Sequence, residues 1–479
     1  MDYHDSLLSA IGQTPLVRLG KIAAGVRPLV LAKIEYLNPG GSVKDRIALG
    51  MVRAAEQAGA LRPGGTIVEP TSGNTGVGLA MVAALRGYAC IFTCPDKVSQ
   101  PRIDLLRGYG AQVVVCPAAV PQDDPRFYRN VAGEIAAGLP GGCLLDQYSN
   151  AANPQAHRET TGPEIWRQTD GRVTHFVAGL GTGGTLSGAG GYLKEVSRGR
   201  VTVAGVDPDG SRYTGQVLRP YLLEGVGQPS LPRSYDPAVA DELIMVTDAE
   251  AFAMTRALAV REAILAGGSG GMAVAGALRL AGRLGEDAVI VVIVPDSGRG
   301  YLSKIFNDDW LAERGFDVPA AGGPSLARRQ ARADGGDARA SGPPTAAVAR
   351  DLVTVPASGT VGEALGVLRG HGLAAAPVTA AAPPVRLAEV IGTVTAASLS
   401  AAVASGQAAP SDAVRGHLLP PPAFAGAGQP LSRARDLLEG GDVVLVLSDG
   451  LVAGMVTRQD LDPMPGHAPS LTRSEVENR

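Results

Sequence analysis

One lysine in this sequence occupies a position that suits a nucleophilic amine. It lies in Asn38-Pro39-Gly40-Gly41-Ser42-Val43-Lys44-Asp45-Arg46, a glycine turn that follows the apolar run 29–34. Ser42 and Asp45 have the spacing of a helix-capping box, so we expect Lys44 in the first turn of a helix. An ammonium group there faces the positive end of the helix dipole, which favours loss of its proton. Such a lysine can form a Schiff base with an aldehyde, although an exposed helical lysine fits the motif alone equally well.

A second turn combines hydroxyls, an amide and glycines. Thr71-Ser72-Gly73-Asn74-Thr75-Gly76 lies between a strand-like run at 66–69 and an apolar helix candidate at 77–85. Backbone N–H groups and hydroxyls that converge at a helix N-terminus bind anions such as a substrate carboxylate. The amide of Asn74 can also donate to a phenolate-like oxygen of a cofactor ring. An ordinary helix cap is the alternative.

A third turn has the arrangement of a phosphate cradle. Gly181-Thr182-Gly183-Gly184-Thr185 connects an apolar strand candidate at 175–180 to a helix candidate at 186–193. The turn lacks the lysine of nucleoside-triphosphate loops and the pattern of dinucleotide-binding loops. It therefore favours the phosphate of a small cofactor over either nucleotide, and a tight turn without ligand is the alternative.

A fourth element lies far downstream. The apolar run 288–294 predicts a central parallel strand, and Ser297 follows its carboxyl end, where ligands bind in open α/β sheets. A neutral hydroxyl that faces a pyridine nitrogen leaves it unprotonated, which suits β-elimination better than transamination. With Lys44, this pattern favours pyridoxal phosphate, whereas a serine in a surface turn is the alternative.

Taken together, these turns resemble the fold-type-II pyridoxal-phosphate enzymes, the family of cystathionine β-synthase and O-acetylserine sulfhydrylase. The resemblance covers residues 3–311. It is also carried by Ile11-Gly12-Gln13-Thr14-Pro15-Leu16-Val17, by 146–157, by Glu224-Gly225-Val226-Gly227 and by Gly267-Gly268-Ser269-Gly270-Gly271. It implies an α/β fold of two open twisted sheets with flanking helices, similar to the tryptophan synthase β subunit.

The family's residue roles carry over to matching positions. The resemblance implies that Lys44 is the catalytic Schiff-base lysine. The implied cofactor-binding residues are Asn74 at the ring 3'-oxygen, Gly181, Thr182, Gly183, Gly184 and Thr185 at the phosphate, and Ser297 at the pyridine nitrogen. The implied substrate-carboxylate residues are Thr71, Ser72, Asn74, Thr75 and Gln147, whereas Tyr148, Glu224 and Gly225 line the entrance for the second substrate. No metal is implied.

The implied reaction condenses L-serine with L-homocysteine to L-cystathionine and water, with hydrogen sulfide production as a side activity. Pro295-Asp296-Ser297 and a long C-terminal extension favour this synthase branch. Little chain precedes the core and it contains no cysteine, so no haem is expected. Cysteine synthesis from O-acetylserine and sulfide, a serine or threonine dehydratase, and a non-catalytic adenosyl-ligand sensor remain open as alternatives.

The composition of the chain limits the classes of partner and the compartment that we expect for it. The chain has 479 residues, 45% of them hydrophobic, and a net charge of −3, which gives no basic footprint for nucleic acid. No apolar run approaches the ~20 residues that span a bilayer, and the acidic, polar N-terminus does not read as a signal peptide. The four cysteines, Cys90, Cys94, Cys116 and Cys143, are interpreted as reduced and buried. We expect a cytoplasmic homodimer or homotetramer.

The second part of the chain contains an internal repeat. We expect a catalytic core at 1–317, a flexible linker at 318–345, a repeated module at 346–465 and a tail at 466–479. The segment 390–399 matches 451–461, in a repeat of about 60 residues whose copies read as helix, strand, strand and helix.

This module resembles a tandem pair of the nucleotide-sensing modules called CBS domains. The resemblance implies an adenosyl ligand, S-adenosylmethionine or an AMP-like molecule, with Asp460 as the ribose-binding acid beside Thr457. The first copy has Ser398 where the acid is expected, so one site is degraded. The alternative is a module that only packs against the core or a neighbouring subunit.

Overall fold

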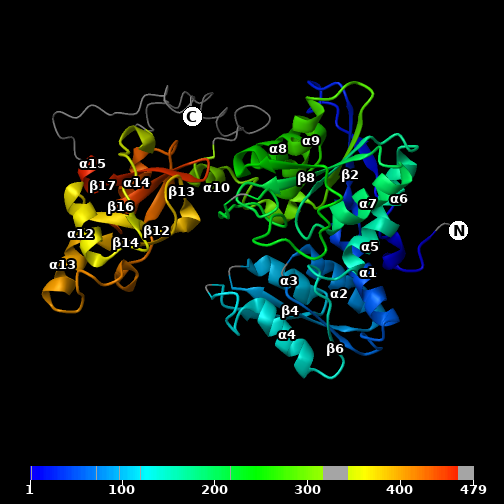
Figure 1. Cartoon of the computed structure of the whole chain (residues 1–479), viewed down its shortest axis with the longest axis horizontal. Helices are drawn as coiled ribbons and strands as arrows, with labels where there is room; N and C mark the ends of the chain where they lie inside the picture. Colours follow the sequence, from blue (N-terminus) through cyan, green and yellow to red (C-terminus); the bar gives the residue numbers. More distant parts are fainter. Residues whose placement is uncertain are drawn as a thin grey trace, which may run out of the picture. The chain divides into compact units, whose positions relative to one another are not determined.

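The computed structural model (Figure 1) divides the chain into two compact units, Met1–Tyr301 and Leu302–Arg479. It describes residues 1–316, apart from 2, 72, 97, 119 and 216, and residues 344–461. The division falls before the core boundary expected at 317, because α10 (Asp308–Glu313) packs against β15 (Ala423–Gly426) of the second unit. Most of the predicted linker and all of the predicted tail lie outside the described residues.

The first unit contains a six-stranded sheet in the order β1-β2-β10-β7-β8-β9, parallel except for β1. Its strands are β1 (Leu16–Arg18), β2 (Leu29–Ile34), β7 (His175–Gly179), β8 (Thr202–Pro208), β9 (Glu242–Val246) and β10 (Val289–Val294). β10 lies between β2 and β7 and is buried almost throughout. The continuous apolar run therefore identified a central strand, because a parallel strand covered on both faces has no polar side.

Helices cover this sheet and complete the lobe around it. They are α5 (Ala152–Glu159), α6 (Thr161–Gln168), the π-helical turn η3 (Leu186–Gly190), α7 (Gly191–Val196), α8 (Asp248–Glu262) and α9 (Gly268–Ala281). α9 packs across five of the strands, and α8 packs on α9.

Both units also contain short 3₁₀ helices. Those of the first unit are η1 (Leu7–Ala10), η2 (Glu35–Leu37) and η4 (Gly298–Tyr301), and those of the second are η5 (Thr345–Ala347), η6 (Leu387–Glu389) and η7 (Val414–His417).

A smaller, wholly parallel sheet in the order β5-β4-β3-β6 forms a second lobe of the first unit, below the first lobe in Figure 1. Its strands are β3 (Thr66–Glu69), β4 (Ala89–Pro95), β5 (Gln112–Cys116) and β6 (Gly142–Leu144), and its helices are α1 (Lys44–Gln57), α2 (Asn74–Arg86), α3 (Gln100–Gly108) and α4 (Tyr128–Gly138). All four cysteines lie in these strands, buried and free of disulfides, as predicted.

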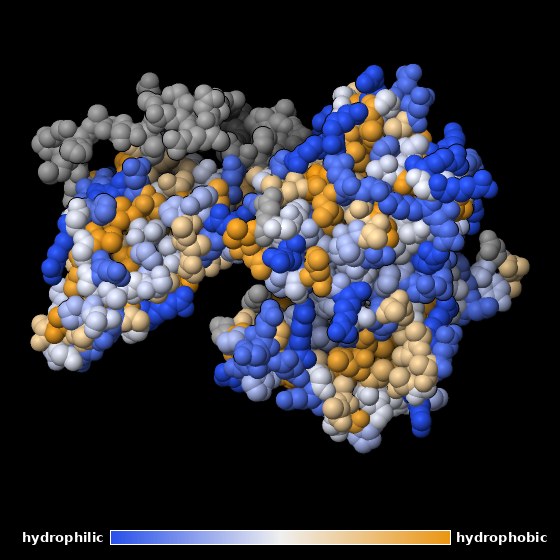
Figure 2. Space-filling view, viewed as in Figure 1, coloured by the Kyte–Doolittle hydropathy of each residue, from blue (hydrophilic) through white to orange (hydrophobic). Residues whose placement is uncertain are grey.

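The surface of the first unit is predominantly polar in the view of Figure 2, and hydrophobic residues gather on the lobe of the smaller sheet. In the part of the chain that the structure describes, no helix combines the length and the apolar character needed to cross a membrane.

The second unit repeats one order of elements, strand, helix, strand, strand and helix. The first copy comprises β11 (Val355–Pro356), α12 (Val361–Gly370), β12 (Ala375–Thr379), β14 (Val390–Thr395) and α13 (Ala396–Ala404), with the short β13 (Val385–Arg386) inserted. The second comprises β15, α14 (Leu431–Leu438), β16 (Val443–Ser448), β17 (Leu451–Thr457) and α15 (Arg458–Leu461). The internal repeat detected in the sequence is thus a repeat of structure.

Candidate active site

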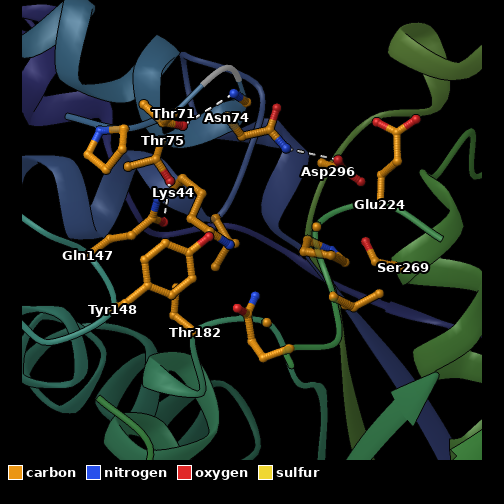
Figure 3. A pocket seen from close by; sticks show the side chains of 18 of the residues that line it. Lys44, Thr71, Asn74, Thr75, Gln147, Tyr148, Thr182, Glu224, Ser269 and Asp296 are labelled. Atoms are coloured by element: carbon orange, nitrogen blue, oxygen red, sulfur yellow. Dashed lines mark hydrogen bonds between the residues drawn. The ribbon is translucent and has the colours of Figure 1, made fainter. Parts of the chain in front are cut away.

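A cavity of about 330 Å³ opens in the first unit, lined by residues of both of its lobes (Figure 3). The structure brings these predicted site residues to its wall: Lys44, Thr71, Asn74, Thr75, Gln147, Tyr148, Gly181, Thr182, Glu224 and Gly225. Gly183, Gly184, Thr185 and Ser297 are not among the lining residues, and Ser72 lies outside the described residues.

Lys44 begins helix α1 and extends its side chain into the cavity (Figure 3). Burial lowers the pKa of its amine, and the nearby carboxylate of Asp296 opposes that shift only in part. The sequence attributed the tendency to lose a proton to the helix dipole, and burial adds a second cause. An amine that is easily deprotonated suits both attack on an aldehyde and general base catalysis.

The start of α1 was predicted correctly, but its cap was not. Val43 is the N-cap residue and makes no capping bond with its side chain. Ser42 Oγ accepts from the N–H of Lys44 at 3.2 Å, and the carboxylate of Asp45 reaches back to the N–H of Gly40 at 2.5 Å. The capping box fails because Ser42 lies one residue too early, where its backbone pairs with Asp296 of the central strand's end.

The Thr71–Thr75 turn uses its side chains for contacts other than capping. Gly73 is the N-cap of α2, and no side chain caps the helix. Thr75 Oγ1 donates to Gln147 Oε1 at 2.7 Å, and Asn74 Nδ2 donates to Asp296 Oδ2 at 2.9 Å. The polar groups therefore point into the cavity region. The N–H of Gly76 bonds the carbonyl of Gly73 at 3.0 Å, and the N–H groups of Asn74 and Thr75 remain for another acceptor. This geometry suits a bound anion better than the helix-cap alternative.

Gln147 is held by a buried carboxylate at the end of β3. Glu69 accepts from the N–H of Asp146 at 2.8 Å and from that of Gln147 at 3.1 Å. Burial raises the pKa of Glu69 to about 7, although both N–H bonds oppose the shift. The orientation of Gln147 in the cavity thus depends on a group that titrates near neutral pH.

The substitution Glu69→Gln should remove a pH dependence of stability. Because the folded-state pKa is raised, the stabilising contribution of this carboxyl is complete below its ordinary value of 4.5 and is lost as the pH rises to about 7. The variant has no such loss. We expect its melting temperature, relative to the parent, to rise by several degrees between about pH 5 and about pH 8 in thermal unfolding. A constant difference across that range contradicts the role assigned to Glu69.

The glycine loop after β7 is packed too closely for side chains. A Cβ on Gly181 would lie 2.5 Å from the carbonyl oxygen of Gly225, and one on Gly184 would clash with Asn153. Gly183 has φ +81°, a left-handed conformation that favours glycine. The amide of Asn153 donates to the carbonyl of Gln147 at 2.7 Å and to Thr182 Oγ1 at 3.0 Å. The loop is therefore fixed against the substrate side of the cavity.

Two predicted cofactor residues, Thr185 and Ser297, are not among the residues that line the cavity. Thr185 Oγ1 bonds His157 Nε2 at 3.1 Å, and His157 Nδ1 bonds Thr161 Oγ1 at 2.9 Å. Burial lowers the pKa of His157 to about 3, so the imidazole is neutral. Ser297 is half-buried, and its Oγ accepts from the N–H of Arg299 at 3.3 Å. Their contacts with a cofactor stay predictions.

Several lining residues were missed from the sequence: Arg102, Tyr128, Gln228, Ser269, Asp296 and Tyr301. Ser269 and Asp296 belong to segments that carry the resemblance, so the signal was present without a role. Arg102 belongs to no motif. Its guanidinium lies 2.5 Å from Glu224 Oε2 and 5.6 Å from the ring centroid of Tyr301. The pair of opposite charges stands at the cavity wall and comes from both lobes.

The tail residues implied to bind a nucleotide lie at the start of α15. Asp460 Oδ2 accepts from the N–H and the Oγ1 of Thr457, each at 2.7 Å. Its Oδ1 accepts from Arg350 Nε at 2.8 Å and pairs with the Arg350 guanidinium. At the matching position of the first copy, Ser398 bonds Thr395 Oγ1. Both carboxylate oxygens of Asp460 are therefore engaged within the second unit.

The residues present fit a pyridoxal phosphate cofactor. The cavity has a volume within the ~300–1,000 Å³ range of small-molecule sites. An amine of lowered pKa reaches into it, and a glycine loop at the end of β7 offers backbone N–H groups where any Cβ would clash. One buried carboxylate oxygen beside it, Oδ1 of Asp296, has no hydrogen-bond partner among the described residues.

The sequence is similar to those of known proteins. The family model described as pyridoxal-phosphate dependent enzyme matches residues 7–296. A cystathionine beta-synthase of Oryctolagus cuniculus is 46% identical over 318 residues, which are 65% of this chain and 58% of that protein. A cystathionine beta-synthase of Dictyostelium discoideum is 36% identical over 420 residues, which are 86% of this chain and 81% of that protein.

Other similar proteins are named for different reactions. A cysteine synthase 1 of Emericella nidulans is 40% identical over 328 residues, 65% of this chain and 87% of that protein. The crystal structure of an O-ureido-L-serine synthase superposes with a TM-score of 0.61 and 40% identity, covering 65% of this chain and 100% of that one. The matched part of the Oryctolagus protein is thus under two thirds of its length. Because the family model spans more than half of the sequence, this chain belongs to the pyridoxal-phosphate dependent enzymes.

Proposed function

We propose that this enzyme catalyses the β-replacement that condenses L-serine with L-homocysteine to L-cystathionine and water. One observation carries the proposal. The cavity that receives the Lys44 amine and the Thr71–Thr75 turn also has a wall with one positive and one negative side chain, Arg102 and Glu224. An amino-acid donor and a second, zwitterionic amino acid as acceptor fit these two regions.

The cofactor, when bound, supplies an electron sink for negative charge at the α-carbon. Lys44 would hold it through the amine, and the same amine would remove and return the α-proton of the donor. Asn74 would bind the ring oxygen, Ser297 the ring nitrogen and the Gly181–Thr185 loop the phosphate. These roles are supported by the cavity position of Lys44 and Asn74 and by the packing of the loop.

The donor carboxylate is assigned to the start of α2. Thr71 and Thr75 offer hydroxyls there, and the first helical turn offers N–H groups at the positive end of the dipole. Gln147, held by Glu69, is in contact with Thr75 and completes the pocket. We include Ser72 in this set from the sequence alone.

The charged wall favours an amino-acid acceptor over sulfide. A guanidinium and a carboxylate that are about one quarter to one third exposed can exchange their mutual contact for the carboxylate and ammonium of homocysteine. Sulfide has neither group and gains nothing from the pair. Tyr148 also lines the cavity in the acceptor region. The guanidinium carbon of Arg129 lies 4.3 Å from the centroid of its ring and helps to hold the ring in place.

A direct comparison of substrates tests the proposal. Purified enzyme loaded with pyridoxal phosphate is assayed with serine plus homocysteine and with O-acetylserine plus sulfide. We expect a higher kcat/KM for the first pair. A higher value for the second pair supports the alternative of cysteine synthesis, to which the resemblance to a cysteine synthase points. Keto acid formed from serine at the same rate without thiol supports a dehydratase.

The substitution Arg102→Gln should weaken the acceptor and spare the donor. Loss of one charge-assisted hydrogen bond to a carboxylate, about 1.5–3 kcal/mol, predicts a 10- to 100-fold rise in KM for homocysteine. Turnover with sulfide should stay within about twofold. Arg107→Gln, on the same helix with an exposed side chain, is the matched control. Equal losses with both acceptors contradict acceptor recognition by Arg102.

We further propose that the second unit is a tandem CBS-domain module that binds an adenosyl ligand. The repeated order of elements supports the module. A ribose bound by Asp460 must displace Arg350, because that arginine engages the same carboxylate. Calorimetric titration of the full chain with S-adenosylmethionine and with AMP tests binding, and the absence of heat with both favours a module that only packs.

A further inference from the structure

Asp296 is held in position at the cavity by its backbone and by close packing. Its backbone pairs with Ser42, and its carbonyl accepts from the N–H of Gly267 at 3.1 Å. A Cβ on Gly267 would clash with Oδ1 of Asp296, so only glycine leaves room for the carboxylate. The side chain is 5% exposed and lies at the end of the central strand β10. The sequence therefore places a fixed carboxylate at the cavity.

One oxygen of this carboxylate receives two donors from different elements. Asp296 Oδ2 accepts from Asn74 Nδ2 at 2.9 Å and from the hydroxyl of Tyr301 at 2.8 Å (Figure 3 shows the first bond). Asn74 belongs to α2 of the smaller lobe, whereas Asp296 follows β10 of the larger one. The bond to Asn74 thus crosses the cavity.

The chemistry of a carboxylate decides which way the amide of Asn74 points. An ionised carboxylate only accepts, so the amide must turn its NH₂ group to Asp296. Burial raises the pKa of Asp296, whereas the hydrogen bonds from Tyr301 and Asn74 and the charges of Lys44 and Arg102 oppose that rise and favour the ionised form. An amide nitrogen carries two hydrogens, and the second remains for another acceptor. A hydroxyl in place of Asp296 both donates and accepts, so it would not decide the orientation.

We propose that Asp296 is a positioning residue, whose carboxylate orients the amide of Asn74 so that an N–H and not the C=O faces the cofactor ring. The inference rests on the proposed position of Asn74 at the ring 3'-oxygen. A reversed amide would place two oxygens against each other, which weakens cofactor binding and changes the protonation of the ring oxygen. Asp296 acts through Asn74 and need not touch the cofactor.

A double-mutant cycle on the holoenzyme tests this coupling. Cofactor affinity is measured by titration of apoenzyme with pyridoxal phosphate, and the visible absorbance band reports the protonation of the ring oxygen. Neither readout depends on which substrates the enzyme uses. We expect Asp296→Ala to weaken affinity about tenfold or more and to shift the band to shorter wavelength. In an Asn74→Ala background the same substitution should have no further effect.

Two conservative variants separate orientation from charge. Asp296→Asn offers Asn74 a donor as well as an acceptor, so the orientation is no longer decided, and we expect an affinity and a band between those of the parent and of Asp296→Ala. Tyr301→Phe removes the other donor to the same oxygen and should leave the band unchanged. Losses that add in the double variant, or an Asp296→Asn variant that keeps the parent affinity and band, overturn the proposal. A parent protein that binds no pyridoxal phosphate overturns instead the proposed function.

Discussion

The Lys44→Ala variant is expected to lose β-replacement activity by at least about 10³-fold, because one side chain performs several tasks. In the proposed reaction its amine holds the cofactor, removes the α-proton of the donor and returns a proton to the product. No other lysine lines the cavity in the described part of the chain. The loss should appear in kcat as well as in kcat/KM, because the proton transfers take place after the donor is bound.

The colour of the protein gives a second, independent measurement. The parent should absorb at about 410–430 nm when loaded with pyridoxal phosphate, and Lys44→Ala should lack that band. Borohydride reduction followed by mass spectrometry should locate the adduct on Lys44. Lys21→Ala removes an exposed lysine and serves as the control. A variant that keeps both colour and turnover, or an adduct on another lysine, contradicts the assignment.

The sequence predicted elements well where one physical signal determined them. The run that became β10 is short and rich in Val and Ile, which favours a strand covered on both faces, and the glycine turns after β3 and β7 marked the change from strand to helix. The capping box at Ser42 was wrong because the same side-chain spacing serves another purpose when the backbone is paired with Asp296. Local patterns do not report such tertiary pairing.

The missed site residues share a physical reason. Arg102 lies on α3 of the smaller lobe and contacts Glu224 of the larger one, which is 122 positions further along the sequence. Nothing in either neighbourhood indicates the other. Asp296 was visible beside Ser297, but its importance depends on two donors that only the fold brings together. Pairs joined across a cavity are therefore the part of a site that sequence patterns do not specify.

The motif around Lys44 also contains a residue with a structural role, Arg46, which the sequence alone did not explain. Arg46 is buried and donates to both Glu35 and Glu164, with N–O distances of 2.7–2.8 Å. Lys33 donates to Glu164 at 2.8 Å and to the carbonyl of Thr14 at 2.6 Å. Two positive and two negative side chains thus balance each other out of contact with water. The arrangement ties α1 to β2, η2 and α6 behind the cavity.

The pKa values indicate how strongly these charges depend on one another. Burial alone would raise the pKa of Glu164, yet the hydrogen bonds and charges of Arg46 and Lys33 hold it at about 2. The same guanidinium keeps the pKa of the fully buried Glu35 below its ordinary value. Removal of Arg46 would leave two carboxylates with Lys33 as their nearest cation, which is the situation in which a buried ion pair matters most.

We therefore expect Arg46→Leu to lower the free energy of unfolding by about 3–5 kcal/mol and the melting temperature by about 5–15 °C. Arg86→Leu, which breaks a half-exposed pair with Glu56 on the same lobe, should cost less than about 1 kcal/mol in the same unfolding experiment. Adding Glu164→Leu to Arg46→Leu should restore part of the loss, since it removes one uncompensated charge. If the two single arginine variants lower the free energy of unfolding equally, the buried network stabilises the fold no more than an ordinary surface ion pair does. Because Arg46 lies two residues beyond Lys44 on α1, its loss should also weaken pyridoxal phosphate binding, whereas Arg86→Leu should leave that affinity unchanged.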